Sequence, residues 1–309
     1  MLSYRKLAMR VLGRPLHTEG IDSPRPASQR AAALVLTAAM LTTLTAPAFA
    51  GTWYIEDGDI TISAGESGNN VTQNENTTEN DPDTIITNRE EGASSHTVTI
   101  DAKDKDDKVE VTLKDVNIDT SSRNKAAVSV TGEGDTNIKL DGDNALKSDI
   151  YRSGIYGSGS LTISGGENDS LTAQGGSGAD GIYSSGSLTI SGGTVTANGD
   201  DGGRGISSSG SVTISGGSTV TANGGSGTIS GGDGIWSGGG VTISGGSTVT
   251  ANGGNGGSLV GGDGIRSGGG LTVSDGTVTA KGGNGDSKDG YGGDGIWSGG
   301  GVTISGGST

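Results

Sequence analysis

Aromatic side chains recur at one position of a glycine-rich repeat. From Gly154 to the last residue the chain repeats a unit of which residues 234–254, GIWSGGGVTISGGSTVTANGG, are one copy. The residue after each Gly-Ile pair is aromatic in four of six copies, although only 3% of the chain is aromatic. Exposed aromatic rings in a row suit polysaccharide binding, because sugar rings pack their C–H faces against them; alternatively the rings stack on each other or lie under a loop. The candidate carbohydrate-binding residues are Tyr156, Tyr183, Trp236 and Trp297.

Aspartates recur directly before the glycine of the same pairs. Ca²⁺ takes several oxygen ligands, and carboxylates on adjacent repeats can share one ion. Asp-Gly is also a common turn dipeptide, which gives the aspartates an alternative structural role. Arg204 occupies this position in one repeat and favours local charge pairing there. The hypothesis is a Ca²⁺ cofactor bound by Asp180, Asp233, Asp263 and Asp294.

Residue types that support catalysis are scarce. The chain contains no cysteine, and His96 is the one histidine after residue 50, which argues against thiol and imidazole mechanisms. Asp141 and Asp143, the least repetitive acidic pair, flank Gly142 as turn residues do. We therefore expect no enzymatic activity. Threonine pairs such as Thr248 and Thr250 resemble the ladders of ice-binding proteins, but threonine is also a common outward residue of strands.

The repeat itself predicts how these side chains are positioned. Each copy holds three short runs that alternate apolar and polar residues, separated by glycine-rich corners, and such alternation indicates strands. In residues 234–254, Ile235, Val241, Ile243, Val249 and Ala251 would point to one side and Trp236 to the other. Three strands per repeat with inward apolar residues describe one coil of a parallel β-helix. Parallel crossovers are almost always right-handed, so we expect an all-β, right-handed parallel β-helix.

The coils differ in length mainly after the third strand. Their Gly-Ile isoleucines recur every 24 to 31 residues, and segments such as 224–233 and 282–294 hold most of the variation. We expect these segments to form loops on one edge while the stacked core keeps its register. High glycine content can also indicate disorder, but the two-residue alternation in every repeat favours an ordered solenoid.

Residues 1–50 have the pattern of a signal peptide. A basic segment precedes an apolar run over 31–45, and Ala48-Phe49-Ala50 forms a cleavage site before Gly51. The apolar run is short for a membrane span, so we expect an extracellular, secreted or cell-surface protein without membrane insertion after cleavage. Removing the six basic and two acidic residues of this leader changes the formal net charge from −15 to −19. This charge argues against nucleic acid as a partner.

The remaining chain divides into two parts. Residues 51–96 are expected to form an N-terminal cap with a long polar loop over 64–95, because a first coil would otherwise expose a strand edge. Residues 97–309 are expected to form the coils of the helix. The final repeat stops before its third strand, which indicates a chain that is a fragment of a longer protein.

Several segments carry a family resemblance. Residues 51–62 (GTWYIEDGDITI), 115–118 (DVNI) and the repeated G-I-x-S-G and V/L-T-I-S-G-G units resemble secreted bacterial carbohydrate-binding domain proteins, over essentially all of residues 51–309. The resemblance implies a calcium-containing β-helix similar to a clostridial protein that binds polygalacturonate. We therefore expect a polysaccharide partner, with calcium-assisted binding of an acidic, pectic glycan. The alternative is a structural or adhesive surface repeat without a sugar site.

Overall fold

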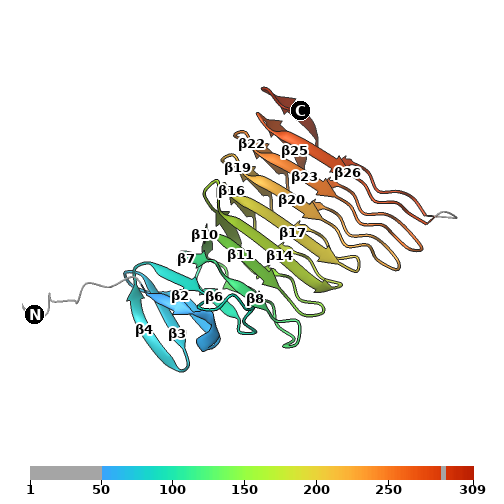
Figure 1. The fold of residues 1–309 in the computed structure, drawn as a ribbon. Helices are drawn as coiled ribbons and strands as arrows, with labels where there is room; N and C mark the ends of the chain where they lie inside the picture. Colours follow the sequence, from blue (N-terminus) through green and yellow to red (C-terminus); the bar gives the residue numbers. More distant parts are fainter. Residues whose placement is uncertain (1–50, 287–289) are drawn as a thin grey trace, which may run out of the picture. The chain divides into compact units, whose positions relative to one another are not determined.

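The computed structural model describes residues 51–286 and 290–309. The expected signal peptide, residues 1–50, lies outside the described residues. The described chain consists of strands, turns and one short 3₁₀ helix, η1 (Ile55–Asp57). These strands form three sheets that the chain visits in turn, so that the expected parallel β-helix with three strands per coil is confirmed (Figure 1). The described residues contain no helix with the length and hydropathy needed to cross a membrane.

Sheet 1 contains the strand that follows each Gly-Ile corner. Its pairs are parallel except at the N-terminal side, where β2–β3 and β3–β4 are antiparallel. Its strands are β2 (Ile60–Ala64), β3 (Asn69–Gln73), β4 (Asn76–Asp81), β6 (Val98–Ala102), β9 (Val128–Gly132), β12 (Ile155–Gly157), β15 (Ile182–Ser184), β18 (Ile206–Ser208), β21 (Ile235–Ser237), β24 (Ile265–Ser267) and β27 (Ile296–Ser298).

Sheets 2 and 3 hold the second and third strand of each coil. Sheet 2 contains β1 (Thr52–Tyr54), β5 (Thr84–Thr87), β7 (Lys108–Lys114), β10 (Asp135–Asp141), β13 (Ser160–Ser164), β16 (Leu188–Ser191), β19 (Val212–Ser215), β22 (Val241–Ser244), β25 (Gly270–Ser274) and β28 (Gly301–Ser305). Sheet 3 contains β8 (Asn117–Asp119), β11 (Asp143–Lys147), β14 (Ser170–Ser177), β17 (Thr194–Asp200), β20 (Thr219–Asn223), β23 (Thr248–Asn252) and β26 (Thr277–Lys281).

The core is a stack of aliphatic side chains in register. The expected inward isoleucines pair with one another across neighbouring strands of sheet 1 and are 0% exposed; they are Ile182, Ile206, Ile235 and Ile265. Val241, Ile243, Val249 and Ala251 of sheets 2 and 3 are buried as expected. A single coil buries too few side chains to offset the entropy of ordering its residues, so stability depends on stacking.

Serine forms a second inward column at the end of β15, β18, β21 and β24. These side chains are fully buried, and each hydroxyl donates to a glycine carbonyl of the preceding coil, as from Ser208 to Gly186 at 2.8 Å and from Ser237 to Gly210 at 2.9 Å. The serine of the G-I-x-S-G unit therefore satisfies a corner carbonyl where the backbone turns toward sheet 2.

The polar segment 64–95 differs from the loop that we expected. It contains β3 and β4, which extend sheet 1 as an antiparallel hairpin, and β5, which pairs with β7 in sheet 2. Ser94 then bridges to Ile118 of β8. The segment therefore completes an early coil that starts at β2, before residue 97, and the hairpin covers the edge of sheet 1. Asparagine and threonine fill β3 and β4, which leaves little apolar periodicity to detect.

The segments after sheet 3 are an ordered layer of extended glycine backbone, which lies on one edge of the coils in Figure 1. In the coils after β20, β23 and β26 the glycine segment that leaves sheet 3 bonds to the one that returns to sheet 1, as from Gly232 N–H to Gly225 O at 2.9 Å. Between coils the bonds continue, as from Gly254 N–H to Gly232 O at 2.8 Å. We call this layer the glycine array; its bonded members are Gly203, Gly225, Gly232, Gly254, Gly262, Gly283 and Gly293.

Candidate functional site

In β12, β15, β21 and β24 the middle residue points outward, since the residues on both sides of it are buried. Strand register places Tyr156 beside Tyr183, Ser207 beside Trp236 and Arg266 beside Trp297, with Ser207 also beside Tyr183. The predicted column across successive coils is therefore present. Toward the N-terminus the same row continues with the smaller Ser129 and Thr99.

The aromatic column has two parts with different surroundings. The rings of Tyr156 and Tyr183 lie nearly parallel, with 5.3 Å between centroids and 14° between planes. Trp236 and Trp297 instead contact guanidinium groups: Arg204 Cζ lies 4.4 Å from the Trp236 ring centroid, and Arg266 Cζ lies 4.9 Å from that of Trp297. Such contacts are attractive because the cation faces the negative π surface. Among the described residues the cation–π contacts involve Tyr54, Trp236 and Trp297, and neither Tyr156 nor Tyr183 takes part in one.

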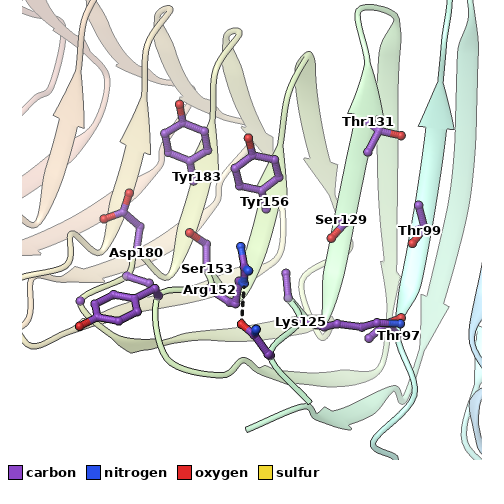
Figure 2. A pocket seen from close by; sticks show the side chains of 15 residues that line it. Thr97, Thr99, Lys125, Ser129, Thr131, Arg152, Ser153, Tyr156, Asp180 and Tyr183 are labelled. Carbon is purple, nitrogen blue, oxygen red and sulfur yellow. Dashed lines mark hydrogen bonds between the residues drawn. The ribbon is translucent and has the colours of Figure 1, made fainter. Parts of the chain in front are cut away.

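A groove of about 690 Å³ lies along sheet 1 next to the two tyrosines. Figure 2 shows the two rings next to each other, their hydroxyls pointing the same way, with Ser129 and Thr131 on the neighbouring strand. Hydroxyl and aromatic side chains of four strands, and of the residue just before β6, form the floor: Thr97, Thr99, Ser129, Thr131, Tyr156 and Tyr183. Residues of the preceding corners form one side: Asn124, Lys125, Tyr151, Arg152 and Asp180.

The two cations at this groove differ in their partners. Lys125 Nζ donates to Asp59 Oδ2 at 2.9 Å. Burial alone would raise the pKa of Asp59, but hydrogen bonds from Lys125 and the Thr97 N–H hold it well below the usual range. Arg152 Nε donates to the Asn124 amide oxygen at 3.3 Å, and among the described residues no carboxylate oxygen lies within 4.0 Å of its guanidinium. Arg152 is therefore the cation available to an anionic ligand.

Tyr151 is a further aromatic residue at the groove, and our sequence analysis missed it. It is 77% exposed, with a φ of 58° that is uncommon for a residue other than glycine. Its ring covers Gly178, where an added Cβ would lie 2.9 Å from Tyr151 Cε1. The signal was the corner Ile150-Tyr151-Arg152, since all later coils have glycine at the position of Tyr151.

The aspartate column forms hydrogen bonds between coils. Asp180 Oδ1 accepts the N–H of Arg204 at 2.7 Å, and Asp233 Oδ1 accepts the N–H of Asp263 at 2.8 Å. Asp263 Oδ1 in turn accepts the N–H of Asp294 at 2.7 Å. One carboxylate oxygen of each bonded aspartate is thus used to join its coil to the next.

The other carboxylate oxygens of Asp233 and Asp263 face arginines at a smaller hollow of about 310 Å³. Arg204 Nε lies 3.5 Å from Asp233 Oδ2, and Arg266 Nη1 lies 3.6 Å from Asp263 Oδ2. Burial disfavours the charged carboxylate and raises the pKa of both Asp180 and Asp233. Among the described residues no group of three or more acidic or histidine side chains can hold a metal ion. The expected calcium site therefore stays a prediction.

The other columns have contacts typical of stacked coils. Asn223 Nδ2 donates to Asn198 Oδ1 at 2.8 Å, and Asn252 Nδ2 donates to Asn223 Oδ1 at 2.9 Å, as expected for an asparagine ladder. Asp141 pairs with Lys114 at 2.6 Å, while Asp143 accepts a hydrogen bond from Ser170 at 2.7 Å. These two acidic residues do not line the groove beside the tyrosines.

Comparison with known proteins finds no matching family model, no matching curated protein and no matching solved structure. The expected membership in a carbohydrate-binding family therefore stays a prediction.

Proposed function

We propose that this protein is a non-enzymatic β-solenoid that binds polysaccharide in the groove beside Tyr156 and Tyr183. One observation carries the proposal: two nearly parallel tyrosine rings lie on adjacent strands beside a groove of about 690 Å³. Concave sites with aromatic surfaces and a few polar groups are typical of ligand binding. The threonine and serine hydroxyls of the floor supply donors and acceptors for sugar hydroxyls.

The charges at the groove support an acidic glycan as the ligand. Arg152 has no carboxylate partner among the described residues, and a guanidinium can donate two parallel hydrogen bonds to a uronate carboxylate. Direct contact with Arg152 would offset part of the repulsion between an acidic glycan and a chain that has a net charge of −19 after cleavage before Gly51. The calcium bridge through the aspartate column is a second route for the same ligand, and it requires an ion to compete with Arg204 and Arg266.

A structural or adhesive surface repeat without a sugar site is the second candidate. The observation that favours it is the contact of Trp236 and Trp297 with arginines of the same chain, because rings held in this way stabilise the protein's own surface without contacting a ligand. In this case the tyrosine pair would also be an internal contact, and its removal would change stability without changing any glycan binding.

Affinity electrophoresis against pectic and neutral glycans tests the function. We expect Tyr156→Ala and Tyr183→Ala each to weaken binding by roughly tenfold, the order of one lost aromatic contact. Tyr291→Ala is the matched control, since this tyrosine is 78% exposed and does not line the groove. Arg152→Gln should weaken binding of acidic glycans more than of neutral ones. Absence of binding to every glycan, or equal loss in Tyr291→Ala, contradicts the proposal.

A chelator separates the two routes to an acidic glycan. Binding through Arg152 continues in chelator and weakens with added monovalent salt. Binding through a calcium bridge disappears in chelator, and Asp233→Ala with Asp263→Ala weakens it. Undiminished binding in chelator therefore excludes the bridge.

Export is part of the proposal, because polysaccharide binding of this kind takes place outside the cell. Protein recovered from the medium or the cell surface is expected to begin at Gly51, as Edman sequencing or mass spectrometry would show. Recovery of a chain that begins at Met1 or Met9 contradicts cleavage at Ala50.

A further inference from the structure

Ser207 interrupts the outward row of sheet 1 between two aromatic residues. Register places it next to Tyr183 on one side and Trp236 on the other. Tyr156 and Trp297 at the equivalent positions are 44% and 40% exposed. Ser207 is 0% exposed although it also lies in the outward row. The Arg204 side chain lies over it, with Nη1 3.3 Å from Ser207 Oγ and Cζ 4.4 Å from the Trp236 ring centroid.

Contacts with three coils hold Arg204 in this position. Its backbone N–H donates to Asp180 Oδ1 on the preceding coil at 2.7 Å. Its Nε lies 3.5 Å from Asp233 Oδ2 on the following coil, and this carboxylate is largely buried. The guanidinium is therefore fixed between a serine, an aspartate and an indole ring, rather than extended into solvent.

The N-terminal side of the tyrosine pair offers an internal comparison. There too the row continues with a serine, Ser129, which pairs with Tyr156. The residue three positions before Ser129 is Ala126, and the residue three positions before Ser207 is Arg204. Beside Ala126 the groove is open, and Ser129 lines it. Beside Arg204 the equivalent space is filled by the arginine itself.

We infer that Arg204 is a specificity-determining residue that ends the groove after Tyr183 and keeps Trp236 from the ligand. The inference rests on the proposed function, since it assigns one end of the proposed glycan site. A glycan chain that runs along the solenoid axis contacts Tyr156 and Tyr183 and then meets the guanidinium. The position three before the outward residue therefore controls how many coils the ligand can cover.

The shielding of Trp236 can be measured without any glycan. Arg204→Asp places an aspartate at this position, as the following coils have at Asp233 and Asp263. The new carboxylate can accept the N–H of Asp233, so the hydrogen bonds between successive coils are preserved. Acrylamide quenching of tryptophan fluorescence should increase in Arg204→Asp relative to the unsubstituted protein, and this increase should disappear when Trp236→Phe is added. Unchanged quenching would overturn the inference.

The effect on the ligand is measured with oligosaccharides of increasing length, prepared from a polysaccharide that the protein binds. For the unsubstituted protein, affinity should stop increasing once the ligand covers Tyr156 and Tyr183. In Arg204→Asp it should continue to increase with length, and for an uncharged oligosaccharide it should reach roughly two- to tenfold tighter binding, the order of one further aromatic contact. An acidic oligosaccharide also meets the added carboxylate, so for such a ligand the dependence of affinity on length, and not the absolute affinity, is the readout. Adding Trp236→Ala should remove this gain.

Ala126→Arg provides the reverse test, because it places an arginine beside Ser129 as Arg204 lies beside Ser207. We expect it to close the open side of the groove and to weaken glycan binding, without a change in the circular dichroism spectrum. If the unsubstituted protein binds glycan but Arg204→Asp has the same length dependence, the inference is wrong and the proposed function stands. If the unsubstituted protein binds no glycan, both are wrong.

Discussion

Burial of Asp180 disfavours the charged form of its carboxylate. Burial raises its pKa, even though the Arg204 N–H and guanidinium favour the charged form. The folded protein therefore holds this proton more tightly than the unfolded chain does, and the contribution of Asp180 to stability decreases as pH rises from the ordinary carboxyl pKa through the raised one.

Asp180→Asn tests this linkage. The amide oxygen can still accept the Arg204 N–H, while the buried charge is removed. We expect a higher unfolding midpoint near pH 7 and a smaller decrease in stability between pH 4 and 7, as followed by thermal unfolding across that range. Asp106→Asn, in an exposed turn, is the control. A lower midpoint at pH 7 would show that the charge stabilises the fold.

Ser237 shows how one buried hydroxyl supports the stacking of coils. Its Oγ lies 2.9 Å from Gly210 O and 3.2 Å from Gly240 O, and its side chain is fully buried. Ser237→Ala leaves a corner carbonyl without this donor, which should lower the free energy of unfolding by about 1–3 kcal/mol. Denaturant unfolding measures the change, with the exposed Ser209→Ala as control. Equal stability of the two variants would mean that water replaces the hydroxyl.

The glycine array depends on the close approach of backbones. An added Cβ at Gly262 would lie 1.9 Å from Gly232 O, although the backbone there needs no positive φ. We expect Gly262→Ala to separate the segments and to destabilise the protein by roughly 1–3 kcal/mol, as overpacking does. At Gly292 the nearest atom is 3.4 Å away, so Gly292→Ala should have little effect in the same unfolding experiment. Faster amide exchange at Gly283 and Gly293 should accompany the first variant only.

The strands in which aliphatic and polar residues alternate were predictable from the sequence. The strands without such alternation were not. Ile206, Ile235 and their partners specify period, register and core together, because a shift by one residue would expose them. The hairpin β3–β4 is built from asparagine and threonine and has little such pattern. The glycine array has no side chains from which to infer pairing.

At the groove, the tyrosine column follows from register, whereas Tyr151, Arg152 and the contact of Arg204 with Trp236 depend on corner geometry that the repeat does not encode.

The stacked coils behave as interchangeable units, since equivalent positions pair in register from β12 to β27. Deletion of residues 206–234 joins Gly205 to Ile235, which restores a Gly-Ile corner of the same kind. We expect a folded protein with an unchanged β-type circular dichroism spectrum and a somewhat lower unfolding temperature, because one coil and one interface are lost. Deletion of residues 206–219 breaks the order of the three sheets and should prevent folding. If both deletions fold equally well, the coils are not the units of stability.

In-register coils of nearly the same sequence also have a genetic consequence. Residues 235–248 and 296–309 have the same sequence, so the gene is expected to contain similar stretches that can misalign during recombination. Each unequal exchange of whole coils adds or removes complete rungs and leaves every hydrogen-bond ladder closed. A lineage can therefore lengthen this surface, or change the order of its tyrosine, serine, tryptophan and arginine rungs, without passing through an unfolded intermediate. Copy number then becomes an inherited means of changing the length of the solenoid and the side chains that its outer face presents.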